Sequence, residues 1–206
     1  MSSGLHLFLE LTTLLFFLVV VAHALVLRGR DGAWLMGSML ALGFVRENCV
    51  ALYHWLYRFA DLHLHLGAAP LITAIIWGYS IYIAICWAES VCGEAVCGDS
   101  LETRRASPRL LAALGVFMIA LVGFYEPFLE LVDMAKWQDG TRRTLGVPWI
   151  ALVGYPTLSV PFVAGWCHIM RRHRGRARLA WMTVFVVTLA FGHAWGLQWL
   201  KGVLGW

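Results

Sequence analysis

Three carboxylates lie close together in the segment Phe124–Trp149, which reads FYEPFLELVDMAKWQDGTRRTLGVPW. Glu126, Glu130 and Asp133 stand at positions i, i+4 and i+7. Trp137 follows at i+11, so a continuous helix would place all four side chains on one face. They end an apolar run, LLAALGVFMIALVG, that is typical of a membrane-buried helix. Ionisable groups at membrane depth are costly, so these carboxylates are candidate functional residues.

The three carboxylates are compatible with three kinds of role. Close carboxyl groups share protons, so one of them can act as a general acid at neutral pH. Carboxylate oxygens also bind hard cations. Alternatively, the group is a solvated helix end paired with Lys136, Arg142 and Arg143. Glu126 is the deepest acid and precedes Pro127, which loosens the helix, so Glu126 and then Asp133 are our first choices for a proton donor.

A fourth acid, Glu47, lies in the stretch FVRENCVALYHWLYRF. Arg46 precedes it, and His54 follows at i+7 on the same helical face. The alternatives are a buried acid tuned by these neighbours and an interfacial Arg–Glu pair with snorkelling side chains. We favour a functional acid, because Glu47 is deep for a purely interfacial residue.

Aromatic residues make up 14% of the chain, and many of them flank the acidic segments. Aromatic faces stabilise cations. An acid beside an aromatic, apolar chamber therefore suits protonation of an alkene, because the chamber shelters the tertiary carbocation that results. Ordinary packing and membrane-interface belts are the alternative. Tyr53, Tyr79 and Tyr155 belong to this aromatic group, and the predicted substrate-binding residues are Trp55, Tyr57, Trp77, Tyr125, Trp137, Trp149 and His54.

Histidines suggest a different chemistry. Haem ligation by two histidines needs one intramembrane His on each of two helices. The eligible residues are His23, His54, His168 and His193, although a hydrogen-bonded core or interfacial role also explains each. The LHLH motif at Leu62–His65 lacks the repeated His boxes of membrane di-iron enzymes. Cys92 and Cys97 are too few ligands for a metal, and they can pair if their loop faces an oxidising side. We expect no metal at this loop, and haem ligation stays open as an alternative.

The elements that position these residues follow from composition. The chain has 206 residues, of which 60% are hydrophobic and 14% charged, and its mean hydropathy is +0.71. These values predict an all-α integral membrane protein with a single transmembrane domain over residues 1–206. The net charge of +4 is small, and the basic residues cluster in loops, which indicates topology and lipid headgroups rather than nucleic acid.

Six segments have the length and apolarity of a spanning helix, for which about 20 residues are needed. A break is expected at RGRDG, Arg28–Gly32, between the first two. A seventh helix or a re-entrant piece in Tyr53–Leu66 would change this assignment. The predicted spans are Leu5–Leu27, Ala33–Tyr57, Ala68–Val91, Arg109–Asp133, Val147–Met170 and Leu179–Leu200.

Basic residues are distributed unevenly between the two sides of this bundle. The positive-inside rule places the richer side in the cytoplasm, which puts both termini and the acidic helix ends on the other side. The richer side has ten, Arg28, Arg30, Arg104, Arg105, Arg109, Arg171, Arg172, Arg174, Arg176 and Arg178, and the other has five, Arg58, Lys136, Arg142, Arg143 and Lys201.

A faint internal repeat relates residues 33–92 to residues 109–170. Pro70, in LGAAPLI, follows Glu47 at nearly the same interval as Pro148, in LGVPWI, follows Glu126. Proline suits the start of a helix, because its missing N–H is unpaired there anyway. Each unit holds two helices, so both copies would share one orientation about an axis along the membrane normal. Coincidence in an apolar sequence is the alternative.

These motifs resemble those of the bacterial and archaeal membrane carotenoid hydratases, which belong with the carotenoid biosynthesis proteins. The two-unit arrangement also resembles the heterodimer-type membrane lycopene cyclases, and a small membrane terpene cyclase would use the same acid-initiated step. The resemblance covers roughly Phe44–Trp166. It rests on Glu47, Tyr57-Arg58-Phe59, LGAAPLITAIIW, Glu126-Pro127, Trp137 and GVPW. It implies a lipophilic isoprenoid substrate in the bilayer, no metal or redox cofactor, acidic proton donors, and location in the bacterial inner membrane.

The chain departs from the family pattern in three respects. Val122 and Gly123 stand where members usually have an Asp one turn before the acid–Pro pair. The segment HWLYRFADLHLH replaces a Gly-rich aromatic stretch, and the chain is short for a hydratase.

We therefore expect an isoprenoid hydratase or terpene cyclase that acts by protonating a C=C bond, with no prediction of its oligomeric state. The predicted catalytic residues are Glu126, Asp133, Glu47 and Glu130. The alternatives are a membrane electron-transfer protein that binds haem or quinone and a transporter with a carboxylate relay.

Overall fold

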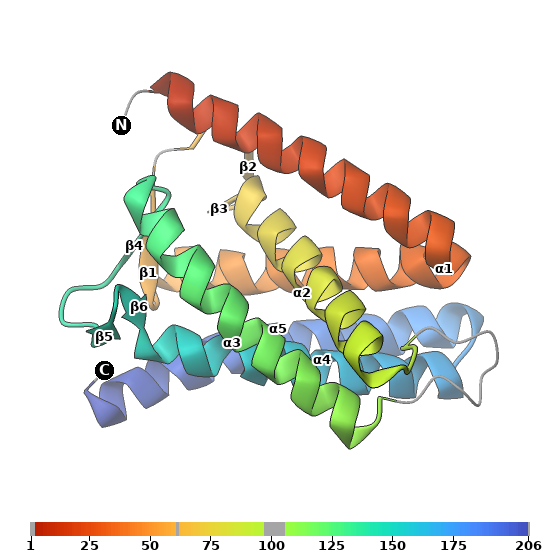
Figure 1. The fold of residues 1–206 in the computed structure, drawn as a ribbon. Coiled ribbons are helices and arrows are strands. Elements are labelled where there is room, and N and C mark those ends of the chain that lie inside the picture. Colours follow the sequence, from red (N-terminus) through yellow and green to blue (C-terminus); the bar gives the residue numbers. More distant parts are fainter. Residues whose placement is uncertain (1–2, 61, 97–105, 206) are drawn as a thin grey trace.

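The computed structural model describes residues 3–60, 62–96 and 106–205 and shows a mainly helical chain (Figure 1). Its helices are α1 (Ser3–Tyr53), α2 (Leu71–Cys92), α3 (Pro108–Leu131), α4 (Trp149–Arg172) and α5 (Gly175–Leu204). All five are long and apolar enough to cross a membrane. The prediction of an all-α chain with membrane-length helices is thereby confirmed.

The predicted count of six helices was wrong, because the first two predicted spans are joined in α1. This helix has 51 residues, and the expected break falls inside it at Gly29, where φ is 52° and ψ is −131°. Glycine adopts this backbone conformation without a steric penalty. The two halves of α1 diverge from a shared corner at this point, so one element runs to the far end of the molecule and back (Figure 1).

The helices form a closed ring of contacts. Helix α2 packs against α1 and α3, α4 packs against α3 and α5, and α5 completes the ring by packing against α1. Most residues of α2 are buried, whereas many apolar side chains of α1 and α5 are exposed, as on a surface that faces lipid. A Cβ on Gly43 of α1 would lie 2.6 Å from the backbone oxygen of Ala74. Glycine at this position therefore permits the close approach of α1 and α2.

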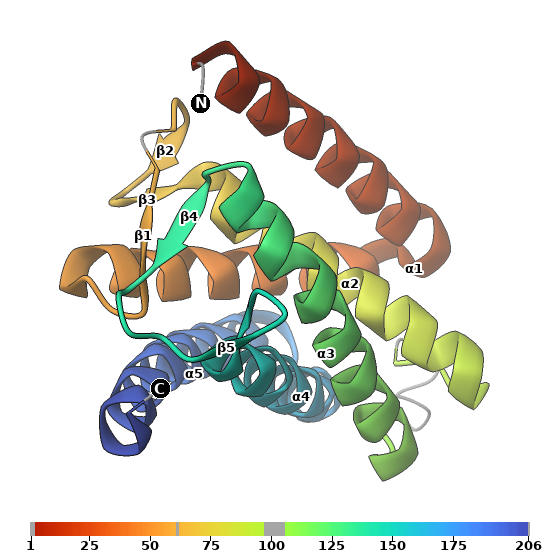
Figure 2. The same cartoon turned by 60° about the vertical axis from the view of Figure 1, so that its left-hand side comes forward.

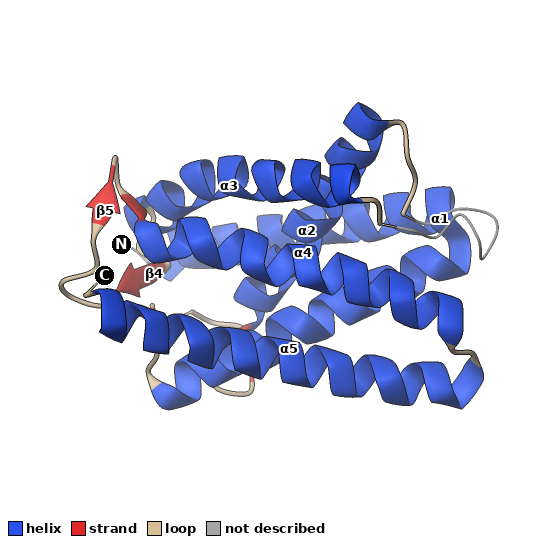
Figure 3. Cartoon of the chain, turned by 90° about the horizontal axis from the view of Figure 1, so that it is seen from below, coloured by secondary structure: helices blue, strands red, loops and turns tan. Residues whose placement is uncertain are grey.

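The short strands of the described residues, β1 to β6, gather at the end of the molecule where α1 begins and α5 ends (Figures 1 and 3). Strands β1 and β4 pair antiparallel, with Tyr57 opposite Trp137 and Phe59 opposite Ala135. Figure 2 shows this pair side by side on the left, at the end of the helix bundle. The other strands form two hairpins, β2 with β3 and β5 with β6. The bounds are β1 Tyr57–Phe59, β2 His65–Leu66, β3 Ala69–Pro70, β4 Ala135–Trp137, β5 Arg143–Thr144 and β6 Val147–Pro148.

Two predicted helix ends were too late in the sequence. The second span was expected to reach Tyr57, but α1 ends at Tyr53, and the described residues of Tyr53–Leu66 beyond it form strands and loop rather than a seventh helix. The fourth span was expected to reach Asp133, but α3 ends at Leu131. Cys92 is a free thiol at the end of α2, and Cys97, its predicted partner, lies outside the described residues.

Residues 33–92 and 109–170 contain the same order of elements. The later half of α1 and helix α3 each lead into a strand, then a hairpin, then a second helix. Pro70 and Pro148 are the N-cap residues of α2 and α4, and both have extended backbone angles. The two units meet through the β1–β4 ladder.

Candidate active site

Glu47 is buried near the strand end of α1 and accepts hydrogen bonds from three side chains. The adjacent Arg46 forms an ion pair with it, the Tyr57 hydroxyl donates to Oε2 at 2.7 Å, and Trp77 Nε1 of α2 donates to Oε1 at 2.5 Å. Glu47 and Arg46 are 1% and 3% exposed. Charge-assisted hydrogen bonds are the stronger kind, so this cluster holds the Glu47 carboxylate in one orientation.

Asn48, the next residue on α1, positions the hairpin that leads into α2. Its Oδ1 accepts a hydrogen bond from the backbone N–H of Ala68 at 2.6 Å. Gly67 has a φ of +77°, and a Cβ there would lie 2.3 Å from Asn48 Oδ1. Glycine is therefore required by both backbone conformation and space, and the turn fixes where α2 and its Trp77 begin.

Glu126 lies in the last two turns of α3 and is 6% exposed. Trp137 Nε1 of β4 donates to Oε2 at 2.7 Å, and the Tyr155 hydroxyl of α4 donates to Oε1 at 2.8 Å. Neither donor carries a positive charge, and no ion pair to Glu126 occurs within the part of the chain that is described. The two buried acids therefore have different electrostatic partners.

The surroundings of Glu47 and Glu126 correspond to one another. Each carboxylate accepts one hydrogen bond from an aromatic residue of its own unit's strand, Tyr57 or Trp137. Each accepts another from the helix that follows the hairpin, from Trp77 or Tyr155. Tyrosine and tryptophan have exchanged places between the units, so each carboxylate has one of each.

The two acids line one cavity of about 40 Å³. A cavity needs about 10–15 Å³ to hold one water, so this space accommodates a few water-sized groups. The Trp77 and Tyr155 rings are 4.5 Å apart, and the Tyr57 and Trp137 rings 4.9 Å apart. The cavity is walled mainly by aromatic and aliphatic side chains, and its lining residues are Glu47, Tyr57, Phe59, Thr73, Ile76, Trp77, Glu126, Leu129, Ala135, Trp137 and Tyr155.

The aromatic wall already holds a cation. The guanidinium carbon of Arg46 lies 4.7 Å from the centroid of the Trp77 ring and 5.7 Å from that of Tyr57. Both distances are within the range of cation–π attraction. Burial raises the pKa of the Tyr57 phenol well above its ordinary value, so this hydroxyl stays neutral.

Two of the predicted catalytic acids, Glu130 and Asp133, lie outside this cavity, and only Asp133 lies beyond the end of α3. Asp133 follows the end of α3 with a φ of +53° and is paired with Lys136 at 2.8 Å. The hydrogen bond from Lys136 lowers the pKa of Asp133 below its ordinary value. Glu130 forms an ion pair with Arg143 of β5. The predicted single helical face was therefore wrong, since Trp137 reaches Glu126 from β4.

Of the predicted substrate-binding residues, Tyr57, Trp77 and Trp137 line the cavity, and the other four lie elsewhere. Trp55 stacks on Tyr53 at 4.7 Å. The other three are Tyr125, whose ring lies 6.2 Å from Tyr79, Trp149, which donates to Thr144 Oγ1, and His54, which is exposed beyond the end of α1.

Tyr155 was counted among the flanking aromatics but was not predicted as a site residue. The repeat carries the signal that identifies it, because Trp77 stands at i+7 from Pro70 and Tyr155 stands at i+7 from Pro148. Phe59 and Leu129 also line the cavity. Phe59 belongs to the Tyr57-Arg58-Phe59 motif but is not among the predicted site residues, and no pattern in the sequence indicated Leu129.

The histidines considered for haem ligation lie in separate surroundings. His23 Nδ1 is hydrogen-bonded to the Tyr82 hydroxyl, and His193 Nε2 to the backbone oxygen of Gly154. His168 is exposed on α4. No cluster of three or more His, Cys, Asp or Glu side chains suited to a metal occurs among residues 3–60, 62–96 and 106–205.

Comparisons with protein-family models, with curated proteins and with solved structures gave no match to this chain.

Proposed function

We propose that this protein is a membrane enzyme that protonates a C=C bond of a polyisoprenoid, with Glu126 as the proton donor. One observation carries the proposal. Two buried carboxyl groups line a single aromatic-walled cavity, and one of them is paired with a cation while the other faces neutral donors. Paired carboxyl groups in different surroundings commonly divide the roles of acid and fixed anion.

The hydrogen bonds of Glu126 suit the protonated acid as well as the carboxylate. Tryptophan N–H can only donate, so Oε2 keeps the bond from Trp137 in both states. A tyrosine hydroxyl can donate or accept, so a proton on Oε1 can point toward Tyr155. Both oxygens of Glu126 can therefore keep a hydrogen-bond partner whether or not the acid is protonated.

Glu47 is unsuited to the same role. Protonating it would leave the guanidinium of Arg46 buried without its partner, which is strongly unfavourable. Its contribution is a fixed negative charge and the orientation of the Tyr57 and Trp77 rings.

The proposed reaction begins with transfer of the Glu126 proton to the less substituted carbon of a terminal alkene. The π electrons form the new C–H bond and leave a tertiary cation, which the aromatic wall stabilises. In a hydratase, water adds to the cation and returns one proton to the Glu126 carboxylate. In a cyclase, an internal double bond of the substrate attacks the cation and closes a ring, which moves the positive charge to another carbon. A carbon next to this new cation then gives a proton to the same carboxylate.

The reaction requires that the substrate reach Glu126. The cavity of about 40 Å³ is too small for a branched alkene end, so it must widen. The partly exposed lining residues mark the mouth, and they are Tyr57, Phe59, Thr73 and Leu129. Tyr57 and Phe59 also line a larger groove of about 570 Å³ at the strand end. We propose that displacement of the Phe59 side chain admits the end of the substrate.

The proposal is tested by expressing the protein in cells that make linear carotenoids or related terpenoids. The molecular masses of the products are then measured by mass spectrometry. A gain of one water's mass indicates hydration, and an isomer indicates cyclisation. An unchanged product profile across these substrates contradicts the proposal. The absorption spectrum of the purified protein tests the electron-transfer alternative, because bound haem would show a Soret band.

A further inference from the structure

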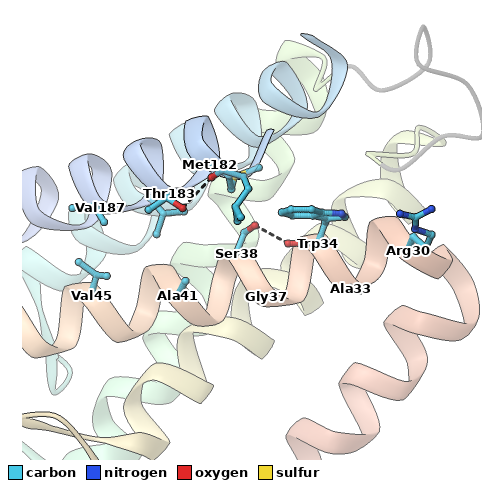
Figure 4. A pocket seen from close by; sticks show the side chains of 12 residues that line it. Arg30, Ala33, Trp34, Gly37, Ser38, Ala41, Val45, Met182, Thr183 and Val187 are labelled. Carbon is cyan, nitrogen blue, oxygen red and sulfur yellow. Dashed lines mark hydrogen bonds between the residues drawn. The ribbon is translucent and has the colours of Figure 1, made fainter. Parts of the chain in front are cut away.

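A long apolar groove runs between α1 and α5, on lining residues none of which is shared with the cavity of Glu47 and Glu126. Its volume is about 540 Å³. Figure 4 shows Ala41 and Val45 on the α1 side, Met182 and Thr183 on the α5 side, and Arg30 beside the corner where the two halves of α1 meet. The lining residues are Arg30, Ala33, Trp34, Gly37, Ser38, Ala41, Val45, Leu179, Met182, Thr183, Val186 and Val187.

The groove is long enough to hold a lipid chain. Ala33, Gly37 and Ala41 follow one another at i, i+4 and i+8, so small side chains form its floor along one face of α1. A Cβ on Gly37 would meet no atom within 4 Å. At a rise of about 1.5 Å per residue, Ala33 to Val45 spans about 18 Å, slightly more than the hydrocarbon thickness of one leaflet, about 15 Å.

One end of the groove opens into a basic pocket of about 580 Å³, with which it shares Arg30 and Trp34. The pocket is lined by four arginines and one acid, Arg28, Arg30, Arg174, Arg178 and Asp31, together with Trp34 and Gly175. Helix α5 begins here at Gly175, and its N-cap residue Arg174 makes no side-chain capping bond. Helix N-terminal amides attract anions.

The arginines of this pocket have different roles. Arg28 is paired with Glu89 at 2.5 Å, and Arg178 donates to the backbone oxygen of His173 at 2.9 Å. Arg28 thereby connects α1 to α2, and Arg178 of α5 connects to the turn that follows α4. Arg30 and Arg174 are exposed at the mouth, where their charges can meet a headgroup.

We propose that this groove and pocket bind an anionic glycerophospholipid, with one acyl chain between α1 and α5 and the phosphate between Arg30 and Arg174. Charge and shape together select this occupant. A basic pocket between membrane helices suits an anionic headgroup on the cytoplasmic side, and the apolar groove begins directly beside it. The arginine-rich end is the one that the charge asymmetry of the sequence places in the cytoplasm.

The experiment is native mass spectrometry of the full chain, with phosphatidylglycerol compared to phosphatidylcholine of the same acyl chains. The wild type should bind phosphatidylglycerol more tightly. The double variant Arg30→Gln/Arg174→Gln should bind it about 30-fold more weakly, from about 1 kcal/mol per arginine. Gly37→Leu should weaken binding by filling the groove. Arg58→Gln, an exposed arginine at the strand end, and Gly192→Leu, an open glycine of α5 outside the groove, are the matched controls.

Equal affinity for the two lipids would overturn the proposal, as would variants that bind like their controls. Inorganic phosphate is added as a competitor to separate a lipid site from a phosphate site. Complete displacement by phosphate, together with unchanged binding in Gly37→Leu, would show an anion site without a lipid chain. Circular dichroism of each variant confirms that it is folded.

Discussion

Tyr57 and Trp137 face each other across the β1–β4 ladder, with ring centroids 4.9 Å apart, and each donates a hydrogen bond of 2.7 Å to the buried acid of its own unit. The ladder therefore brings Glu47 and Glu126 to one cavity although they belong to different units and lie far apart in the sequence. A short antiparallel pair therefore joins the two units at the site, together with the contact between the Trp77 ring of α2 and the Tyr155 ring of α4.

Glu126→Gln should remove activity without disturbing the fold. The amide oxygen can accept from Trp137, and the amide nitrogen can donate to the Tyr155 hydroxyl, so both hydrogen bonds are kept. An amide cannot supply the proton, and loss of a general acid lowers turnover by about 10²–10⁴-fold. Product formation in co-expressing cells measures the effect. Glu130→Gln is the control, since Glu130 is an ion-paired residue outside the cavity.

Glu47→Gln should destabilise the protein, because it leaves the buried guanidinium of Arg46 without its anion. Removing one partner of a buried ion pair costs about 3–5 kcal/mol. The double variant Arg46→Met/Glu47→Gln should recover part of this loss, because no unpaired charge remains. Denaturant unfolding in detergent micelles measures all three proteins. A double variant less stable than Glu47→Gln would contradict the ion-pair explanation.

Tyr57→Phe should lower stability by about 1–3 kcal/mol, because it removes a donor from the buried Glu47 carboxylate. It should also change the response to alkali. Burial raises the pKa of the Tyr57 phenol in the folded protein, whereas in the unfolded chain the same phenol ionises near pH 10. The stabilisation from the neutral phenol is thus fully present below about pH 10 and declines as pH rises further. The melting temperature of the wild type should therefore fall more steeply above pH 10 than that of Tyr57→Phe.

Gly43→Ala should destabilise the packing of α1 on α2 by about 1–3 kcal/mol, the range typical of overpacking. The added methyl group would meet the Ala74 backbone oxygen at 2.6 Å and the Trp77 Cβ at 2.9 Å. The displacement reaches the site through Trp77, so product formation should fall as well. Gly37→Ala is a matched control on the same helix, where the methyl group enters open space. Equal melting temperatures for the two variants would refute this packing.

Asp133→Asn should leave product formation and stability at neutral pH close to those of the wild type. Asn tolerates the left-handed backbone of this position, and the side chain lies outside the cavity. Lys136 lowers the Asp133 pKa, so any stabilisation from the pair is present above about pH 4 and is lost as pH falls below that value. A large loss of product in this variant would restore Asp133 as a candidate proton donor.

Several features were predictable because local sequence specifies them. Apolar length predicted the membrane helices, and the segment RGRDG predicted the break that α1 shows at Gly29. Glu47 and Glu126 were identifiable as acids at unusual depth, and both are buried.

The remaining features depend on contacts between distant segments. Helical periodicity placed Trp137 on the same helix as Glu126, whereas the strand pairing with Tyr57, which belongs to the first unit, sets its position. Asp133 lies outside the cavity because α3 ends before it, at Leu131. Apolar composition specifies the exact end of a helix poorly. Tyr155 faces Glu126 because α4 begins after the β5–β6 hairpin, and such a short strand pair leaves little trace in sequence.

The most direct test of the central claim is the incorporation of solvent deuterium into the isoprenoid product. Wild-type membranes are incubated in heavy water with the substrate identified by co-expression, and the product is analysed by mass spectrometry. Protonation by Glu126 predicts one carbon-bound deuterium from solvent in each product molecule, together with loss of product in Glu126→Gln. Product that forms without carbon-bound deuterium, or undiminished turnover in Glu126→Gln, would contradict acid initiation by Glu126.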